Sequence, residues 1–332
     1  MNGGHPPLTW IVGRGGLLGG AISKTWQARG GREGQWAPDA AIRWEDEGTA
    51  TRQLGASITS FLEQADNEQR PWRILWCAGA GVVATGADAL SRETRVYSGF
   101  MAALGDALGL GRPGAAPGSF FLASSAGGVY AGSATRPPFD EESPTGSISP
   151  YGAEKIAQEE TTRCFARERG IPTLIGRISN LYGSGQDPFK PQGLITQVGS
   201  SALRRRPVSI YVPLDTIRDY LFVEDAALLI TRAIERLEED CRGWAYPHVV
   251  VKVIASEVDS TVATVLAAWR LVLKRSPGVA LASSPVGLLQ PRRLSFRSRV
   301  WPDLRVEPTP LPVGVHAVFR DQLRRLQAGE LR

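Results

Sequence analysis

The sequence is poor in cysteine and has no long apolar run. No stretch of about 18 apolar residues occurs in the chain, so we expect no membrane-spanning helix. The N-terminus, MNGGHPPLTW, lacks the basic and apolar regions of a signal peptide. The three cysteines (Cys77, Cys164 and Cys241) have no metal-ligand spacing, and their odd number is typical of free thiols in a reducing compartment. We therefore expect a cytoplasmic protein without a membrane span or a metal site.

The marks of a nucleic-acid-binding protein are also missing. The net charge is +5 at pH 7, but the 38 basic residues are spread along the chain beside 33 acidic ones. The one compact basic run, at 204–206, follows a helical pattern and fits a solvated helix end. No zinc-finger, RNA-recognition or basic-zipper pattern accompanies it, and no internal repeat stands out. We expect no nucleic-acid partner.

The sequence does contain apolar runs that alternate with helical patterns. With 332 residues, of which 42% are apolar, the chain can bury a large core in one large domain or two lobes. Strand-like runs lie at 8–12, 40–44, 72–81, 119–130 and from 171, with helical patterns at 89–109 and 150–169. The alternation predicts an α/β fold with a doubly wound, mostly parallel sheet. The pattern weakens after about residue 236, which indicates a smaller C-terminal lobe.

A glycine-rich turn follows the first apolar run. In LTWIVGRGGLLGGAISKTWQARG, glycines at positions 13, 16 and 19 separate the apolar run from a helical pattern. Such glycines permit a tight turn, close approach of a pyrophosphate and close packing of helix on strand. The segment predicts the first strand, turn and helix of a dinucleotide-binding βαβ unit.

SPYGAEKIAQE places Tyr151 and Lys155 four residues apart in a predicted helix. Residues at i and i+4 lie on one helix face, so the phenol and the ammonium can converge on one small volume. The same spacing also occurs by chance in ordinary helices. Small and polar residues fall at other predicted strand ends, where an open sheet binds its ligands: Gly79, Gly81, Ser124, Ser125 and Asn180.

Four motifs together resemble the extended short-chain dehydrogenase/reductase family, in particular its nucleotide-sugar enzymes. They are GRGGLLG, SSAGGVY, YGAEK, and NLYGSGQD followed by RDYLFVED, and they span residues 8–230. The C-terminal hundred residues match only loosely. The resemblance implies a Rossmann-like, doubly wound parallel sheet with a smaller C-terminal substrate-binding lobe. It also implies a homodimer formed through the helices around 89–109 and 150–169.

We expect the two lobes to interleave along the chain. The NAD(P)-binding domain is expected at 1–180, with 208–236 returning to it. The substrate-binding lobe is expected at 181–207 and 237–332.

The resemblance implies that Tyr151 is the general acid/base and that Lys155 lowers its pKa while holding the nicotinamide ribose. A free tyrosine has a pKa of about 10. An ammonium and a cationic nicotinamide both favour the phenolate, so they would lower this pKa toward the working pH. Hydride then moves between nicotinamide and a sugar carbon as Tyr151 moves the hydroxyl proton. A hydroxyl of Ser125 or Ser124 would bond the same oxygen, and Ser125 is favoured.

Arginines near the expected adenosine ribose favour NADP. NAD-binding folds place Asp or Glu at the end of the second strand, whereas a 2′-phosphate needs arginine. Arg43 lies near that predicted strand end and Arg14 lies in the glycine turn, but NAD is the alternative if Glu45 or Asp46 serves the ribose. The resemblance assigns the cofactor site to Gly13, Arg14, Gly16, Leu17, Leu18, Gly19, Arg43, Ala78, Gly79, Ala80, Tyr151 and Lys155.

The resemblance also assigns a substrate site. It places Arg218 at the substrate pyrophosphate, with Asn180 in the same cleft and Arg292 or Arg293 as a second clamp. A guanidinium can hold phosphate oxygens bidentately. Alternatively, Arg218 forms a salt bridge to Asp219 or Glu224 that ties down a loop.

Two departures from the family pattern narrow the range of activities that the resemblance implies. Sugar 4,6-dehydratases carry an Asp-Glu pair where this chain has Gly127 and Gly128, which argues against water elimination. TRVYSGF lacks the asparagine that the family usually places before a glycine. We expect an NAD(P)-dependent epimerase or keto-reductase acting on a nucleoside diphosphate sugar. The alternatives are a non-catalytic dinucleotide-binding redox sensor and a reductase of a non-nucleotide carbonyl compound.

Overall fold

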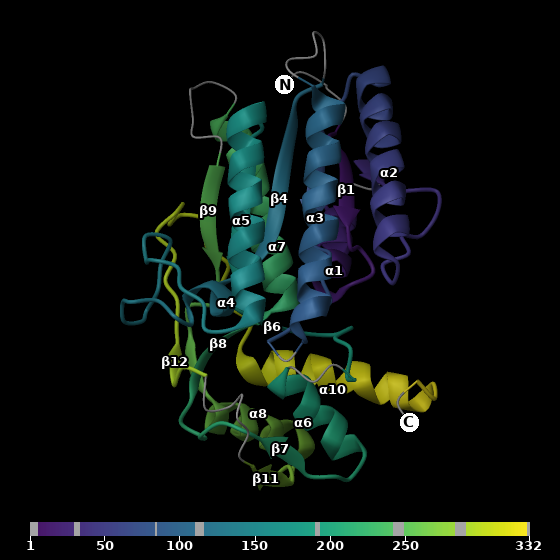
Figure 1. Cartoon of the computed structure of the whole chain (residues 1–332). Helices are drawn as coiled ribbons and strands as arrows, with labels where there is room; N and C mark the ends of the chain where they lie inside the picture. The colour runs from purple at the N-terminus through teal and green to yellow at the C-terminus, as the bar shows by residue number, and fades with distance from the viewer. Residues whose placement is uncertain are drawn as a thin grey trace.

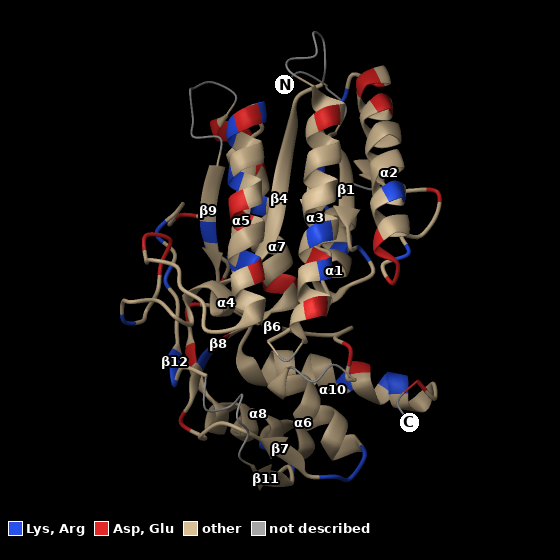
Figure 2. Cartoon of the chain, in the orientation of Figure 1, with Lys and Arg blue, Asp and Glu red and all other residues tan. Residues whose placement is uncertain are grey.

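The computed structural model shows a larger part built on a parallel sheet and a smaller part that lies below it in Figure 1. It describes residues 6–29, 34–83, 85–109, 116–189, 193–241, 249–282 and 290–330. No helix within these ranges is both long enough and apolar enough to cross a bilayer. Acidic and basic residues are mixed along α3 and α5 in Figure 2, as their scatter in the sequence predicts.

The larger part is built on a six-stranded parallel sheet. Its strands, in spatial order, are β2 (Gln35–Trp36), β1 (Leu8–Val12), β3 (Trp72–Trp76), β4 (Gly118–Ser125), β5 (Thr173–Ile178) and β9 (Val249–Ile254). β1 is a continuous apolar run, apart from Thr9, because helices bury both faces of the strand. The predicted Rossmann-like, doubly wound α/β fold is confirmed.

Helices cover both faces of this sheet (Figure 1). One face carries α2 (Glu47–Asn67), α3 (Ala87–Leu108) and α5 (Pro150–Arg169), and the other carries α1 (Leu17–Ala28) and α7 (Val223–Asp240). Successive side chains of a strand point to opposite faces. Trp10 therefore packs with Phe61 of α2 and Phe100 of α3, whereas its neighbour Ile11 lies in a separate core with Ile22 of α1.

The smaller part combines short strands with a helical core. One sheet contains β6 (Asn180–Tyr182), β8 (Ile217–Phe222), β10 (Asp259–Thr261) and β12 (Arg293–Leu294), and β7 (Val208–Ile210) pairs with β11 (Val279–Leu281). Its helices are α6 (Leu194–Leu203), α8 (Val262–Leu273) and α10 (Leu311–Gln327). Trp269 of α8 is fully buried between them. The short helix α4 (Ala126–Tyr130) follows β4 directly.

The predicted strand at 40–44 is wrong. The second strand is β2, and residues 40–46 form the connection from β2 to α2. Two residues of the connection are apolar because Ile42 packs on the core and Trp44 lies edge-on to Trp76 at the end of β3. Asp46 ends the connection by capping α2, where its carboxylate accepts from the N–H of Thr49 at 2.6 Å.

The expected division into lobes also needs correction. β9, at 249–254, pairs with β5 in the central sheet, so the segment 237–332 does not belong wholly to the smaller part. Within 208–236, α7 packs on the central sheet, whereas β7 and β8 belong to the smaller sheets. The strand at 249–254 falls within the range expected for the lobe because a strand's sequence does not say which sheet it joins.

Candidate active site

The glycine turn after β1 forms a tight bend against the end of β3. Gly13 has a φ of 86°, and a Cβ there would lie 2.6 Å from the backbone nitrogen of Ala78. A Cβ at Gly19 would lie 2.5 Å from the carbonyl oxygen of Gly13. Side chains at these two positions would push the turn, α1 and β3 apart.

The helix that follows the turn begins without a side-chain cap. Gly16 is the N-cap of α1 and has no side-chain acceptor for the N–H groups of the first turn, where Leu17 and Leu18 lie. Uncapped N–H groups at a helix N-terminus bind phosphate oxygens. Arg14 is exposed in the same turn. The turn therefore fits the pyrophosphate of a dinucleotide.

The loop after β3 brings the expected cofactor residues 78–80 next to Lys155. A Cβ at Gly79 would lie 3.6 Å from Oε2 of Glu93 and 3.9 Å from Nζ of Lys155. The N–H of Ala80 donates to Oε1 of Glu93 at 2.9 Å. Glu93 of α3 thus holds this loop next to Lys155.

Tyr151 lies at the start of α5, against the beginning of α4. The hydroxyl of Ser149 caps α5 by accepting from the N–H of Gly152 at 3.2 Å. On the α4 side, a Cβ at Gly128 would lie 3.1 Å from Cε1 of Tyr151 and 3.3 Å from Oγ of Ser125. The phenol ring and the Ser125 hydroxyl therefore converge on the backbone of Gly128.

Burial raises the pKa of Tyr151 above its ordinary value. A hydrogen bond with Ser125 opposes this rise, and the negative charge of Glu93 adds to it. The net direction is opposite to the lowering that we expected from Lys155. In the protein by itself burial outweighs the favourable contacts, so the phenol is protonated at neutral pH.

Lys155 lies one turn after Tyr151 on α5. Its Nζ donates to Oε1 of Gln158 at 3.1 Å and to the carbonyl oxygen of Ala123 at 3.4 Å. Burial lowers the pKa of Lys155, whereas the nearby Glu93 and the groups Glu159 and Cys77 raise it. Two carboxylates therefore favour the protonated form of this half-buried lysine.

Ser124 does not face Tyr151, which corrects its place among the candidate catalytic hydroxyls. Its hydroxyl donates to Oε1 of Glu159 at 2.6 Å, and Glu159 forms a buried ion pair with Arg177 at 2.7 Å. Neighbouring residues of β4 point to opposite sides, so only one of the two serines can point toward the phenol. Of these two serines, Ser125 is the one that lies beside Tyr151.

Arg218 is buried in β8 and is bonded to protein groups. Its Nη1 donates to the carbonyl oxygens of Ile217 at 2.8 Å and Pro291 at 2.9 Å, and its Nη2 donates to Oε1 of Gln290 at 3.2 Å. The alternative salt bridge to Asp219 or Glu224 is not formed. Asp219 instead accepts from Ser179 and from the backbone of Ser256.

The other two expected substrate residues lie on strands beside β8. Asn180 is half-buried in β6, opposite Tyr220. Arg292 precedes β12, and its exposed guanidinium forms an ion pair with Asp215. The carbonyl oxygen of Arg292 accepts from the N–H of Ile217 at 2.9 Å. The structure thus gathers Asn180, Arg218 and Arg292 around one small sheet.

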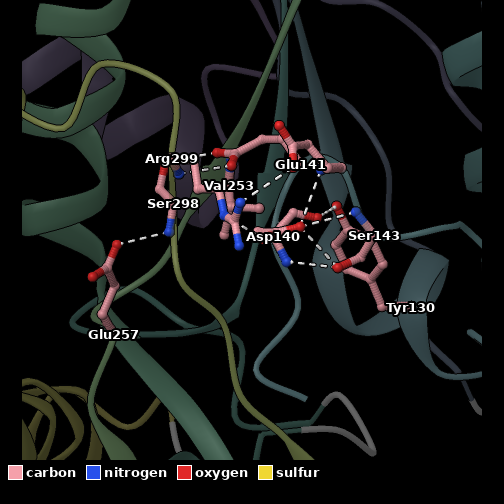
Figure 3. Close-up of polar contacts among 9 residues, drawn as sticks. Tyr130, Asp140, Glu141, Ser143, Val253, Glu257, Ser298 and Arg299 are labelled. Atoms are coloured by element: carbon pink, nitrogen blue, oxygen red, sulfur yellow. Dashed lines mark hydrogen bonds and ion pairs between the residues drawn. The ribbon is translucent and has the colours of Figure 1, made fainter. Parts of the chain in front are cut away.

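A carboxylate from the segment between α4 and α5 fixes the chain after β12 (Figure 3). Oε1 of Glu141 accepts from the N–H of Val253 at 2.8 Å and from the hydroxyl of Ser298 at 2.6 Å. Its Oε2 accepts from the N–H of Arg299 at 2.8 Å. The adjacent Asp140 pairs with the Arg299 guanidinium at 2.7 Å. These contacts hold the C-terminal segment, which includes Arg292, against the end of β9.

Arg43 lies in the connection between β2 and α2, seven positions beyond the end of β2 at Trp36. Its side chain is exposed, and its backbone N–H donates to Gln53 at 2.9 Å. The residue directly after β2 is Ala37, so no carboxylate occupies that position. The expected place of Arg43 at the strand end is therefore wrong, because the strand itself was misplaced.

Sequence reasoning missed two residues that contact the centre of the site. Glu93 and Gln158 lie on α3 and α5 and touch the loop after β3 and Lys155, respectively. No motif marks either residue. A helical-wheel analysis would place Gln158 three residues after Lys155 and thus near it on the helix surface.

A model of the NAD dependent epimerase/dehydratase family matches residues 10–246. The dTDP-glucose 4,6-dehydratase of Salmonella typhimurium is 40% identical over 96 residues, which are 29% of this chain and 26% of that protein. The dTDP-glucose 4,6-dehydratase 1 of Escherichia coli is 38% identical over 92 residues, which are 27% of this chain and 24% of that protein. The matched segments span only about a quarter of these curated relatives.

Solved structures match nearly the whole chain. The UDP-glucose 4-epimerase of Thermotoga maritima with UDP-glucose has a TM-score of 0.75 at 19% identity, with 96% of this chain and 99% of that chain covered. MoeE5 in complex with UDP-glucuronic acid and NAD has a TM-score of 0.73 at 18% identity, with 95% and 99% covered. At these identities the likeness concerns the fold.

Proposed function

The chain belongs to the NAD dependent epimerase/dehydratase family, and we propose that it is an NAD(P)-dependent epimerase or keto-reductase of a nucleoside diphosphate sugar. One observation carries the proposal. Ser125, Tyr151 and Lys155 meet beside the Gly79 loop, next to a glycine turn that fits a pyrophosphate. The nucleotide-sugar names of the curated and structural relatives support this substrate class.

We assign each of the three side chains one task. Bound NAD(P) supplies the carbon that accepts or returns a hydride. Tyr151 takes or gives the proton of the sugar hydroxyl, and Ser125 bonds the same sugar oxygen. Lys155 directs an N–H group to the nicotinamide ribose and lends positive charge to the site. Because burial raises the pKa of Tyr151, a cationic nicotinamide would add to the hydrogen bond of Ser125 in favouring the phenolate.

The backbone of α4 argues against a dehydratase, despite the names of the curated relatives. Gly127 and Gly128 provide no acid or base for water elimination. Gly128 also has no room for a glutamate, because a Cβ there would already crowd Tyr151 and Ser125. The choice between epimerase and keto-reductase depends on whether the cofactor stays bound through turnover.

We propose NADP as the preferred cofactor and keep NAD as the alternative. Arg14 is exposed in the glycine turn and forms no ion pair with any described residue. Ala37 provides no carboxylate after β2, and Asp46 is engaged in capping α2. NAD is present in the MoeE5 structure, which supports the alternative.

We also propose a homodimer formed through α3 and α5. A groove of about 710 Å³ runs between these helices, and small residues line much of it, including Ala102, Gly105 and Ala157. Small residues let helices of a second copy approach closely. The cytoplasmic location and the absence of a nucleic-acid partner remain predictions.

The proposed function is tested by incubating the protein with NADPH or NADH and a panel of keto-sugar and hydroxy-sugar nucleotides. We expect oxidation of the reduced cofactor with a keto-sugar, or interconversion of two sugar nucleotides without net cofactor change. Tyr151→Phe should abolish either signal. Cofactor binding without any turnover would favour a redox sensor, and turnover with simple ketones alone would favour a non-nucleotide reductase.

A further inference from the structure

Gln158 connects Lys155 to helix α3. Its side chain is 4% exposed, and its Oε1 accepts from Nζ of Lys155 at 3.1 Å. Its Nε2 donates to Oγ1 of Thr94 at 3.1 Å. Both ends of the amide are therefore used, and its orientation is fixed by a partner on each side.

The two protein contacts of Lys155 leave one donor for a ligand. An ammonium has three N–H donors. One points to Gln158 and one to the carbonyl oxygen of Ala123. The third is free to point toward the Gly79 loop, where the cofactor residues lie.

The asparagine that the family usually supplies from this helix is replaced. Arg95 in TRVYSGF pairs with Glu47 of α2, where its Nε and Nη2 donate to the two carboxylate oxygens at 2.9 and 2.8 Å. The adjacent Thr94 reaches Lys155 through Gln158 instead.

We propose that Gln158, held by Thr94, is the positioning residue of Lys155 and aims its free N–H at the nicotinamide ribose. The ribose is part of the proposed function, whereas the contact itself does not depend on it. A neutral amide suits this role because it accepts from the ammonium without adding a third anion to Glu93 and Glu159. An amide also passes no proton onward, so it holds the lysine and leaves proton movement to Tyr151.

The charged and titratable groups around Lys155 come from α3, from α5 and from the segment after β3. α3 contributes Glu93, α5 contributes Glu159 and Tyr151, and Cys77 follows β3. β4 contributes only the carbonyl oxygen of Ala123. Removing the Gln158 acceptor weakens the stabilisation of the ammonium, so the titration of Lys155 moves to lower pH.

The test measures Lys155 directly in the cofactor-free protein. The rate of its acylation by acetic anhydride is followed against pH by peptide mass spectrometry. Gln158→Met should lower the midpoint by about one pH unit, and Thr94→Val should lower it by less. Gln158→Glu keeps an acceptor and should raise the midpoint. Gln64→Met, at an exposed glutamine of α2, is the matched control and should not change it.

Cofactor binding gives a second measurement. Isothermal titration with NADP and NAD should show about tenfold weaker binding for Gln158→Met and recovery in Gln158→Glu, because one charged hydrogen bond is lost and then restored. If Gln158→Met melts early, Thr94→Val decides the matter, since valine keeps the shape of threonine. A Lys155 midpoint and a dissociation constant that stay at wild-type values in Thr94→Val and Gln158→Met would overturn the proposal.

These results are separable from the proposed function. A protein that binds no nicotinamide cofactor refutes the proposed function, while the Lys155 titration still reports on Gln158. A cofactor-binding protein whose Lys155 titrates alike in all variants refutes only the positioning role.

Discussion

Replacing Gly128 with alanine tests how closely Tyr151 and Ser125 must be held. The added methyl group would lie 3.1 Å from the Tyr151 ring and 3.3 Å from the Ser125 hydroxyl. Ordinary carbon contacts are about 3.5–4.0 Å, so the ring or the serine must move by a few tenths of an ångström. Gly128 lies in α4 and has no positive φ, so backbone strain does not contribute.

Gly127 provides the matched control. It is the preceding residue of the same helix, and a Cβ there would meet only Leu294, at 3.9 Å. Alanine is favoured over glycine in helices, so Gly127→Ala should be neutral or stabilise the fold by about 0.5 kcal/mol. The two variants therefore add the same methyl group, and only one of them adds it beside the phenol.

We expect Gly128→Ala to lower kcat about tenfold to a hundredfold with the nucleotide sugar found active in the panel, because small misplacements of reacting groups have effects of this size. A tenfold loss corresponds to about 1.4 kcal/mol in the barrier. Cofactor affinity and melting temperature should stay close to wild type. A Gly128→Ala enzyme with wild-type kcat, or an equal loss in Gly127→Ala, would refute the close contact of Tyr151 and Ser125 as the basis of catalysis.

Four further substitutions test separate parts of the site. Tyr151→Phe should reduce turnover about 10²–10⁴-fold and leave cofactor affinity nearly unchanged. If the variant kept more than about a tenth of the wild-type activity, Tyr151 could not be the general acid/base. Arg218→Ala should weaken binding of nucleoside diphosphates by about 1.5–3 kcal/mol in calorimetry, whereas unchanged affinity with a lower melting temperature would limit Arg218 to holding the chain at 290–291. Arg14→Ala should weaken binding of NADP more than that of NAD, and equal losses would contradict the NADP preference. Arg177→Met should lower the free energy of unfolding by about 3–5 kcal/mol in urea, because it removes the nearest cation of the buried Glu159 carboxylate and leaves Arg163 at 3.5 Å, and a loss below about 1 kcal/mol would contradict that reasoning.

Local patterns predicted the elements that carry the glycine turn and the Tyr151–Lys155 pair. The glycine turn and the helix of Tyr151 are set by residues within one short segment, so their sequence is enough to identify them. The strand at 40–44 failed because Ile42 and Trp44 are apolar for packing against the sheet and not for membership of it. Periodicity cannot separate these two reasons for an apolar run.

Contacts between distant segments could not be read from the sequence. The orientation of Ser124 depends on Glu159, which lies 35 residues away, and the bonds of Arg218 depend on residues more than 70 positions away. Two adjacent serines look equivalent in a motif. They differ only when α5 brings a carboxylate to one and a phenol to the other.

The charges around Lys155 explain why a neutral residue at 158 matters. Burial disfavours the ammonium, and Glu93 and Glu159 counteract it. The negative charge of Glu93 raises the pKa of Tyr151, so it opposes formation of the phenolate. A third carboxylate near the lysine would secure its charge further but would make ionisation of the phenol harder. Gln158 adds a hydrogen bond to the lysine without that cost, so the site keeps a cation next to a phenol that can still lose its proton when positive nicotinamide is bound.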